Sequence, residues 1–201
     1  MLQTRASILA RYWYCAEECR LLFNGFESKP TEAKSRGDKI HKWLAQRPKT
    51  PTEIRLISKL EELKPFYRDY KGVRIFGTPD DYKVKRKKVA LEEYKSVSGW
   101  GSVDFWEKFE YPCAEFQINT YHFIMQPILE RLGYELKDLG YIYLFDRTGR
   151  FMRKYSVRFI ESMYLADLDT VLAVVTGEMQ PIPPKSFKCK TCEFRGRGCR
   201  L

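Results

Sequence analysis

The segment from Phe76 to Lys95 is the part of the sequence that most constrains the fold. Its second half, Val-Ala-Leu-Glu-Glu-Tyr-Lys, alternates with a period of two and predicts a β-strand on which Leu91, Glu93 and Lys95 share one face. Asp80 lies upstream, across a lysine-rich turn. Two carboxylates supply hard oxygen ligands for Mg²⁺ or Mn²⁺, and a lysine beside them can orient an attacking water. The segment predicts a hairpin with a metal site, and a solvated hairpin is the alternative.

The composition indicates a folded chain with a polyanionic partner. The 201 residues suit one domain, and 44% hydrophobic with 15% aromatic content argues against disorder. A net charge of +10 and a pI near 9.3 make nucleic acid the first candidate partner. Basic proteins of thermophiles share this composition, so charge alone does not decide the function.

The sequence contains neither a recognisable secretion signal nor a membrane span. The amino terminus lacks an uninterrupted apolar run of signal-peptide length, and no window approaches the length needed to cross a bilayer. Six cysteines are too few for a disulfide scaffold. We therefore expect a cytoplasmic protein with no membrane partner, whose cysteines are metal ligands or core thiols.

Hydrophobic periodicity predicts alternating helices and strands. Helices are predicted at residues 5–24, 31–46 (opened by Thr31), 52–63, 114–132 and 160–175. Strands are predicted at residues 72–76, 81–84, 88–95, 139–146 and 151–157. Residues 96–112 read as an irregular, aromatic-rich insert whose rings mostly pack over the core, and a linker begins with the prolines at 181–184. No internal repeat is present.

The turn between the second and third predicted strands is strongly basic. It contains Lys85, Arg86 and Lys87, and Lys83 precedes it. Such a turn protects an edge strand from unwanted pairing. It also suits contact with phosphates beside the metal site. The two interpretations are compatible.

Three cysteines near the carboxyl terminus predict a thiolate centre. Cys189, Cys192 and Cys199 lie in a polar, glycine-rich segment that cannot be core. Thiolate sites for zinc or iron–sulfur clusters favour four ligands, and no histidine is nearby. Cys15 or Cys19 of the first predicted helix could complete the set. Because the ligands are split across the chain, an iron–sulfur cluster is favoured over a zinc ribbon.

Together these residues form an ordered set that resembles a known family. The set comprises Cys15, His41, Gly77-Thr78-Pro79-Asp80, Glu93-Tyr94-Lys95, Gln117-x₃-Tyr121 and Cys189, Cys192 and Cys199. It resembles the RecB-type branch of the PD-(D/E)xK nucleases. More closely, it resembles the CRISPR-associated RecB-like exonuclease family of the Cas-four type, whose nuclease domain carries an iron–sulfur cluster. The match covers nearly the whole chain, from Cys15 to Cys199. Each motif alone is weakly specific, but the six motifs in this order are specific for the family.

The resemblance implies roles for individual residues. Asp80, Glu93 and His41 would bind the catalytic Mn²⁺ or Mg²⁺ together with the main-chain carbonyl of Tyr94, and Lys95 would position the attacking water. Gln117 and Tyr121 would contact DNA or hold the catalytic residues in position. The cluster would be held by Cys15, Cys189, Cys192 and Cys199, with [4Fe–4S] favoured and [2Fe–2S] as the alternative. The family often has Pro-Arg after its first cysteine, whereas Ala16-Glu17 follows Cys15 here, which leaves Cys19 as the other candidate.

The resemblance also implies a fold and a function. The expected fold is α/β: a restriction-endonuclease-like core, with a mixed central sheet flanked by helices, forms one domain over residues 1–201. Residues 1–30 and 185–201 would form the iron–sulfur cap, and residues 31–184 the nuclease core. The expected activity is metal-dependent exonuclease cleavage of single-stranded DNA or overhang ends, 5′→3′. It would trim prespacers beside the CRISPR integrase during spacer acquisition, a part of antiviral defence.

Three alternatives remain open from the sequence. The first is a stand-alone archaeal, viral or phage repair nuclease of the same family. The second is a non-catalytic DNA-binding protein. The third is a binding module whose cysteines bind a structural zinc ion. The pattern predicts no oligomeric state.

Overall fold

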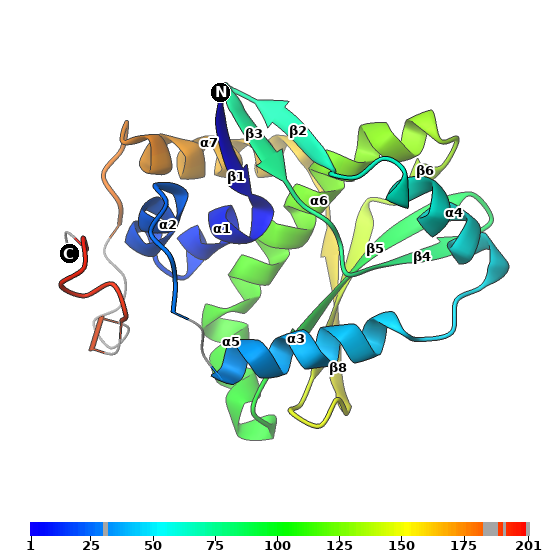
Figure 1. Ribbon diagram of the computed structural model, residues 1–201, viewed down its shortest axis with the longest axis horizontal. Coiled ribbons are helices and arrows are strands. Elements are labelled where there is room, and N and C mark those ends of the chain that lie inside the picture. The colour runs from blue at the N-terminus through cyan, green and yellow to red at the C-terminus, as the bar shows by residue number, and fades with distance from the viewer. Residues whose placement is uncertain (30–31, 183–188, 191, 200–201) are drawn as a thin grey trace.

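A five-stranded mixed sheet lies at the centre of the computed structural model, which describes residues 1–29, 32–182, 189–190 and 192–199 (Figure 1). The strand order is β4-β5-β7-β8, with the short β6 beside β5. The β5–β7 pair is parallel, whereas β4–β5 and β7–β8 are antiparallel hairpins. The strands are β4 (Asp81–Lys85), β5 (Lys88–Ser96), β6 (Glu135–Leu136), β7 (Leu139–Phe145) and β8 (Phe151–Arg158). The predicted mixed sheet is confirmed, and only β6, two residues long, was missed.

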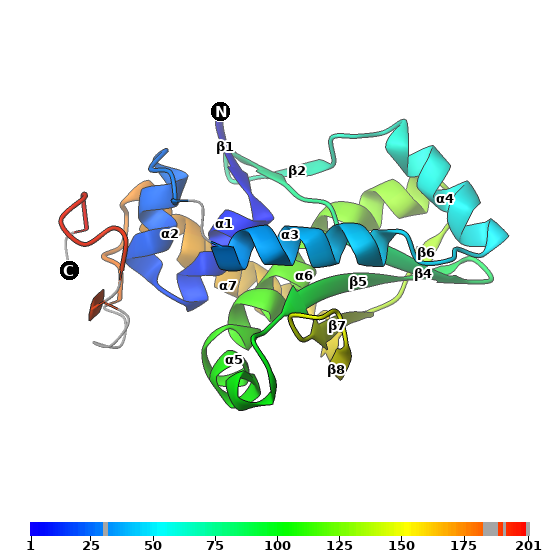
Figure 2. The ribbon, with the colours of Figure 1, turned by 60° about the horizontal axis from the view of Figure 1, so that its bottom comes forward.

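Helices cover both faces of this sheet. The long helix α6 (Tyr111–Arg131) packs against one face, where Ile118 and Ile124 join Leu91 and Ile142 in the main core. Helix α3 (Glu32–Ala45) crosses the other face, as Figure 2 shows. There Ile40, Leu44, Tyr94 and Phe145 form a smaller buried cluster. The predicted helix at 31–46 is confirmed, while its predicted cap, Thr31, lies outside the described residues.

A second, three-stranded sheet adjoins the first. Its order is β1-β3-β2, with β1 (Leu2–Arg5) parallel to β3 (Val73–Phe76) and β2 (Tyr67–Tyr70) antiparallel to it. Only β3 was predicted, because β1 and β2 are four residues long and largely exposed. Helix α4 (Pro51–Glu61) precedes β2 in the chain and starts with a capping box between Thr50 and Glu53.

The predicted single helix at 5–24 is wrong. The segment contains α1 (Ala6–Ala10), the 3₁₀ turn η1 (Arg11–Trp13) and α2 (Ala16–Phe23), after the strand β1. Cys15 breaks the helix because its backbone is extended, with φ −158° and ψ 111°, and its sulfur accepts a hydrogen bond from the Glu18 N–H. An N-cap at Cys15 therefore starts a new helix in a different direction.

The segment at 96–112 is also more regular than predicted. It contains a 3₁₀ turn, η2 (Trp100–Ser102), and a helix, α5 (Val103–Phe109). Trp106 is buried, and its ring contacts Tyr111 and Tyr155, so this aromatic residue packs over the core as expected. The helix escaped detection because seven residues are too few for a clear period.

The last helix, α7 (Glu161–Thr176), ends where Gly177 adopts a left-handed backbone with φ +88°. It confirms the helix predicted at 160–175. The predicted linker falls partly on residues 183–188, which lie outside the described residues. Among the helices that the structure describes, none is long and apolar enough to span a bilayer.

Candidate active site

Asp80 lies where the two sheets meet. The segment Gly77-Thr78-Pro79 carries the chain from β3 to Asp80, immediately before β4. A side chain at position 77 would place its Cβ 2.7 Å from the Tyr121 ring, so the close approach to α6 requires glycine. Cavities of about 240 and 200 Å³ adjoin this segment, and Thr78 lines both. The candidate site is therefore accessible from the surface.

Two different elements bind the carboxylate of Asp80. Its Oδ2 atom accepts a hydrogen bond from the Tyr94 main-chain N–H at 2.7 Å, and its Oδ1 atom lies 3.1 Å from His41 Nδ1. Because the N–H and C=O of one strand residue point to the same edge, the Tyr94 carbonyl also faces the Asp80 side of β5. Three predicted metal ligands are thus brought together by β5, α3 and the β3–β4 connection.

Glu93 and Lys95 lie on the opposite face of β5 from Tyr94, beside α6. The Lys95 ammonium donates to Glu93 Oε1 at 2.6 Å and to the Gln117 side-chain oxygen at 2.9 Å. Gln117 in turn donates to the Tyr121 hydroxyl, one helical turn further along α6. The four residues predicted from this part of the pattern form one continuous hydrogen-bonded chain.

The two carboxylates have opposite pKa shifts. Burial raises the pKa of Glu93 to about 7 despite the Lys95 charge, and the Asp80 charge contributes to the rise. For Asp80, burial is outweighed by the His41 hydrogen bond, the Tyr94 N–H and the Lys95 charge, so its pKa is lowered. Asp80 is therefore ionised at neutral pH, whereas Glu93 is close to its titration point. Two neighbouring carboxyl groups whose pKa values are shifted in opposite directions are typical of functional sites.

The His41 imidazole stays partly exposed, and its pKa is raised. Burial lowers it, but the hydrogen bond and the charge of Asp80 outweigh that effect. The side chain of His41 is 35% exposed and that of Asp80 is 23% exposed. Both can therefore reach a ligand from solvent.

One buried oxygen of the site has no protein partner. Glu93 is 1% exposed, and its Oε2 atom forms no hydrogen bond within the described part of the chain. An unsatisfied buried carboxylate oxygen costs free energy, and a cation would relieve that cost. As they stand, the described residues contain no group of three His, Cys, Asp or Glu side chains close enough to hold a metal. Joint binding of one ion by Asp80, His41 and Glu93 would therefore require these side chains to move closer together.

The basic turn lies far from the carboxylates. Lys85 and Lys88 face each other at the tip of the β4–β5 hairpin, seven residues along β5 from Lys95, which is roughly 23 Å. Arg86 adopts a left-handed backbone with φ +52° in this turn. The hairpin carries Lys85, Arg86 and Lys87 to the opposite end of the strand, so the expectation that they lie beside the metal site is wrong. Lys83 is nearer, because it pairs with Ala90, three residues or roughly 10 Å along β5 from Glu93. Contact of these four residues with DNA stays a prediction.

A buried ionic network behind Asp80 was missed. The carboxylate of Asp81 accepts from Arg47 Nε at 2.6 Å, from the Tyr94 hydroxyl at 2.9 Å and from Lys49. Glu92 accepts from Tyr94 and from Tyr143, which donates at 3.2 Å. No local pattern signals this network, because its members come from separate elements. The one hint in the sequence was the presence of two pairs of adjacent acids, Asp80-Asp81 and Glu92-Glu93.

The carboxy-terminal cysteine segment lies against α2. The Lys29 N–H donates to Glu193 at 2.6 Å, and Phe194 is 1% exposed. Gly198 lies so close to the Phe26 ring that a Cβ there would be 2.9 Å from it. The predicted meeting of the two ends of the chain therefore holds for the described residues of this segment.

The two amino-terminal cysteines have different surroundings. Burial raises the pKa of the Cys15 thiol, and Cys192 is close enough to raise it further. Cys19 is fully buried in the main core, where its thiol points to the Leu9 carbonyl at 3.7 Å. Cys15, rather than Cys19, is therefore the thiol beside the carboxy-terminal segment. Cys189, Cys192 and Cys199 are half-buried, and the described thiols do not form a group of three at metal-binding distance.

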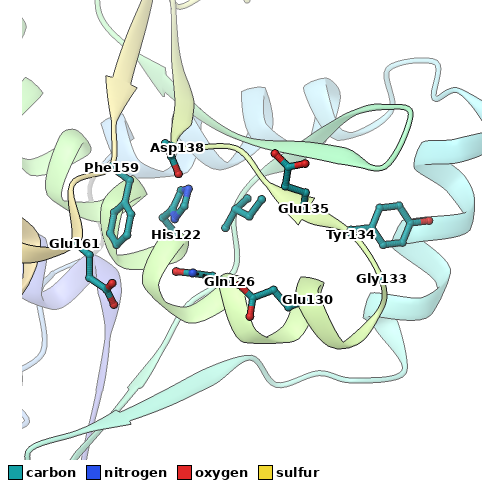
Figure 3. A pocket seen from close by; sticks show the side chains of 10 residues that line it. His122, Gln126, Glu130, Gly133, Tyr134, Glu135, Asp138, Phe159 and Glu161 are labelled. Carbon is teal, nitrogen blue, oxygen red and sulfur yellow. Dashed lines mark hydrogen bonds between the residues drawn. The ribbon is translucent and has the colours of Figure 1, made fainter.

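A further cavity of about 550 Å³ lies near the carboxyl end of α6, away from these residues (Figure 3). Its lining carries four carboxylates, from Glu130, Glu135, Asp138 and Glu161. His122 stacks on Phe159 at 4.2 Å, and burial lowers the pKa of this histidine. A cavity with so many carboxylates repels phosphates, so it is not a site for nucleic acid.

Comparison with known proteins supports the fold. The chain resembles a crystal structure of a protein from Eubacterium rectale that is provisionally named an exonuclease, with a TM-score of 0.57 and 13% identity. That match covers 100% of this chain and 89% of the other. A second crystal structure, of the protein SSO0001, matches with a TM-score of 0.52 and 15% identity over 100% and 88% of the two chains. No family model and no curated protein sequence matches the chain. At these identities the likeness establishes the shared fold, which is consistent with the nuclease core expected from the sequence.

Proposed function

We propose that this protein is a divalent-metal-dependent deoxyribonuclease that hydrolyses phosphodiester bonds at the Asp80–Glu93–Lys95 site. The observation that carries the proposal is the unpartnered Oε2 atom of Glu93, which forms no hydrogen bond within the described part of the chain. Two contacts support it: Asp80 with His41, and Glu93 with Lys95. A purely structural ion pair would satisfy both oxygens of Glu93. The net charge of +10 suits a polyanionic substrate.

The donor set fits Mn²⁺ or Mg²⁺. Carboxylate oxygens from Asp80 and Glu93 and the Tyr94 carbonyl suit hard cations, and the His41 imidazole adds tolerance for Mn²⁺. A bound ion would supply Lewis-acid polarisation of the scissile phosphate. The Lys95 ammonium, fixed by Glu93 and Gln117, would hold the attacking water, and Tyr121 would keep Gln117 in place.

The finer assignment rests on the sequence resemblance. It comprises 5′→3′ exonuclease cleavage of single-stranded DNA or overhang ends, and prespacer trimming beside the CRISPR integrase. A stand-alone nuclease of an archaeon, a virus or a phage would use the same site. The two proposals differ in partners and genomic setting, not in the residues that act.

The proposed activity is tested with single strands labelled at the 5′ or the 3′ end. With Mn²⁺, we expect degradation that EDTA stops, and a 5′ label released first as a mononucleotide or short product. Release of the 3′ label first would contradict the polarity. Intact strands across a range of Mn²⁺ and Mg²⁺ concentrations would contradict the nuclease proposal and favour the non-catalytic DNA-binding alternative.

We propose further that Cys15, Cys189, Cys192 and Cys199 hold an iron–sulfur cluster with a structural role. The burial of Phe194, the close approach of Gly198 to Phe26 and Leu21, and the effect of Cys192 on the Cys15 pKa support a ligand set drawn from both ends of the chain. Four thiolates suit [4Fe–4S] or [2Fe–2S], and zinc is the alternative.

Substitution of single cysteines should separate ligands from core thiols. Purified without oxygen, the parent should be brown, with absorbance near about 400 nm and more iron than zinc. We expect Cys15→Ser and Cys192→Ser to lose most of the iron and to melt at lower temperature. Cys19→Ala is the matched control, because that thiol lies in the core, and it should keep the iron. A colourless, zinc-containing parent, or full iron in Cys192→Ser, would contradict the cluster.

A further inference from the structure

An exposed aromatic and basic surface lies beside α3, at the turn between β7 and β8. Two large rings dominate it: Trp43 is 59% exposed and Phe151 is 53% exposed. The Trp43 ring lies against the turn, since a Cβ at Gly149 would be 3.4 Å from it. Figure 2 shows this turn next to α3. We call the surface formed by Trp43, Tyr141, Arg147, Arg150, Phe151 and Lys154 the aromatic–basic face.

The strand register explains why these side chains are exposed together. Tyr143 pairs with Lys154 and Phe145 pairs with Phe151, so all four lie on the α3 side of the sheet. Among the described side chains of helix α3, Ile40 and Leu44 pack on Tyr94 and Phe145. Trp43 lies one residue before Leu44, at the margin of that contact. The part of the sheet beyond α3, on β7 and β8, is left open.

The cations of this face are available for a ligand. Within the described part of the chain, no carboxylate lies within ion-pair distance of Arg147, Arg150 or Lys154. The Lys154 ammonium instead lies 3.6 Å above the Tyr141 ring. The carboxylate of Asp146, inside the turn, accepts the Thr148 and Arg150 main-chain N–H groups. Three cations that form no ion pair with the described carboxylates, beside exposed rings, favour an anionic ligand.

The combination of rings and cations favours single-stranded nucleic acid. Unpaired bases stack on aromatic side chains while phosphates contact Lys and Arg, whereas a duplex hides the faces of its bases. Isolated surface aromatics need no explanation, but the Trp43 ring lies against a turn that carries two arginines, and Phe151 follows that turn directly. Protein interfaces also use aromatic residues and arginine, but their centres are depleted in charged residues, whereas three cations surround these rings.

The face lies at the same end of the sheet as the candidate active site. Ser96, next to Lys95, pairs with Phe145, which in turn pairs with Phe151. Phe151 is therefore two strands from the end of β5, roughly 10 Å across the sheet. Lys95 itself lies on the α6 side of the sheet, but His41, which contacts Asp80, lies on α3 two residues before Trp43. A strand bound at His41 and Asp80 therefore needs only a few nucleotides to reach the face.

We propose that the aromatic–basic face binds the unpaired bases of single-stranded DNA next to the cleaved bond, with Trp43 and Phe151 stacking on bases and Arg147, Arg150 and Lys154 contacting phosphates. The proposal rests on the proposed nuclease function for its choice of DNA. It adds a second contact that would hold the strand while the active site acts.

Binding is measured without cleavage, by fluorescence anisotropy of labelled oligo(dT) in EDTA with the full chain. Loss of one stacking contact should weaken binding, so we expect Trp43→Ala and Phe151→Ala each to raise the Kd on the order of 10-fold. The matched control is Tyr67→Ala, because Tyr67 is 44% exposed and also carries a cation, Arg74, above its ring. Tyr67 lies in the smaller sheet, and its variant should bind like the parent.

A spectroscopic measurement makes the test independent of folding defects. Stacking on Trp43 should quench the tryptophan fluorescence of the parent during titration with oligo(dT). Trp43→Phe keeps an aromatic ring, so it should retain most of the affinity and lose most of the quenching. Equal affinity of Trp43→Ala and the parent, equal quenching in Trp43→Phe, or equal weakening by Tyr67→Ala would each overturn the proposal. So would equally tight binding of an equal-length duplex.

The outcomes also separate this inference from the proposed function. If the parent cleaves DNA and the variants bind normally, the aromatic–basic face is wrong and the nuclease stands. If the parent cleaves nothing but loses oligo(dT) binding on substitution of Trp43 and Phe151, the face stands and the nuclease proposal fails.

Discussion

Replacement of Lys95 by alanine should reduce Mn²⁺-dependent cleavage of end-labelled single-stranded DNA by about 1000-fold or more. Two effects act in the same direction. The ammonium that would hold the attacking water is lost, and Glu93 loses the cation that donates to its Oε1 atom at 2.6 Å. Because burial already raises the pKa of Glu93 to about 7, removal of this charge raises it further. At neutral pH the carboxyl then holds its proton and is a poorer metal ligand.

The matched control for this variant is Lys59→Ala, an exposed lysine on α4 that contacts none of the site residues. Its cleavage rate should equal that of the parent. The Lys95 variant should still bind oligo(dT) in EDTA and keep the colour of the protein, because neither property depends on the metal site. Digestion by Lys95→Ala at the parental rate would show that the assignment of the active site is wrong.

The fold was largely predictable wherever the hydrophobic period is long or regular. Strand β5 and helix α6 repeat their patterns over nine and 21 residues, and both were placed within a few residues of their bounds. The errors fall on short or interrupted elements. The apolar stripe of residues 5–24 continues through the break at Cys15, so its period gives no sign that the backbone becomes extended there. That break is set by a single cap rather than by a repeating pattern.

The candidate site was predictable to the extent that it follows from strand alternation. Glu93 and Lys95 are two residues apart on one strand, and the structure puts their charged groups in contact. The contact between His41 and Asp80 depends on how α3 packs. The family resemblance predicted this contact, and the hydrophobic period did not. The misplaced basic turn is an avoidable error, since strand rise alone separates Lys88 from Lys95 by roughly 23 Å.

The ionic network around Asp81 could not be predicted, because it is a property of packing. Asp81 is 2% exposed, and its carboxylate accepts hydrogen bonds from Arg47, Lys49, the Tyr94 hydroxyl and the Tyr82 main-chain N–H. These donors join the end of α3, the start of α4 and strands β4 and β5. The network therefore fixes the chain on one side of Asp80 while His41 and Tyr94 hold its carboxylate.

Asp81→Ala should lower the free energy of unfolding by about 3 kcal/mol, because it removes the buried counter-ion of Lys49 and the nearest of the carboxylates that pair with Arg47. Burial raises the pKa of Asp81, but the Lys49 hydrogen bond and the other donors outweigh it and lower the pKa below its usual 3.8. The native state thus binds this proton less readily than the unfolded state. The stabilisation is fully present above about pH 5 and is lost as the pH falls below 3.8.

Urea unfolding at pH 7 and at pH 3 measures both effects. The difference between the parent and Asp81→Ala should be largest at pH 7 and should shrink at pH 3, because the parent carboxylate then begins to take up its proton. The matched control is Asp69→Ala, whose carboxylate pairs with Arg74 at 2.8 Å on the exposed face of the small sheet. An exposed pair contributes little, so this variant should unfold like the parent at both pH values. An Asp81→Ala variant as stable as the parent at pH 7 would mean that the buried ion pairs do not stabilise the fold. The position of Asp80 would then depend on His41 and Tyr94 alone.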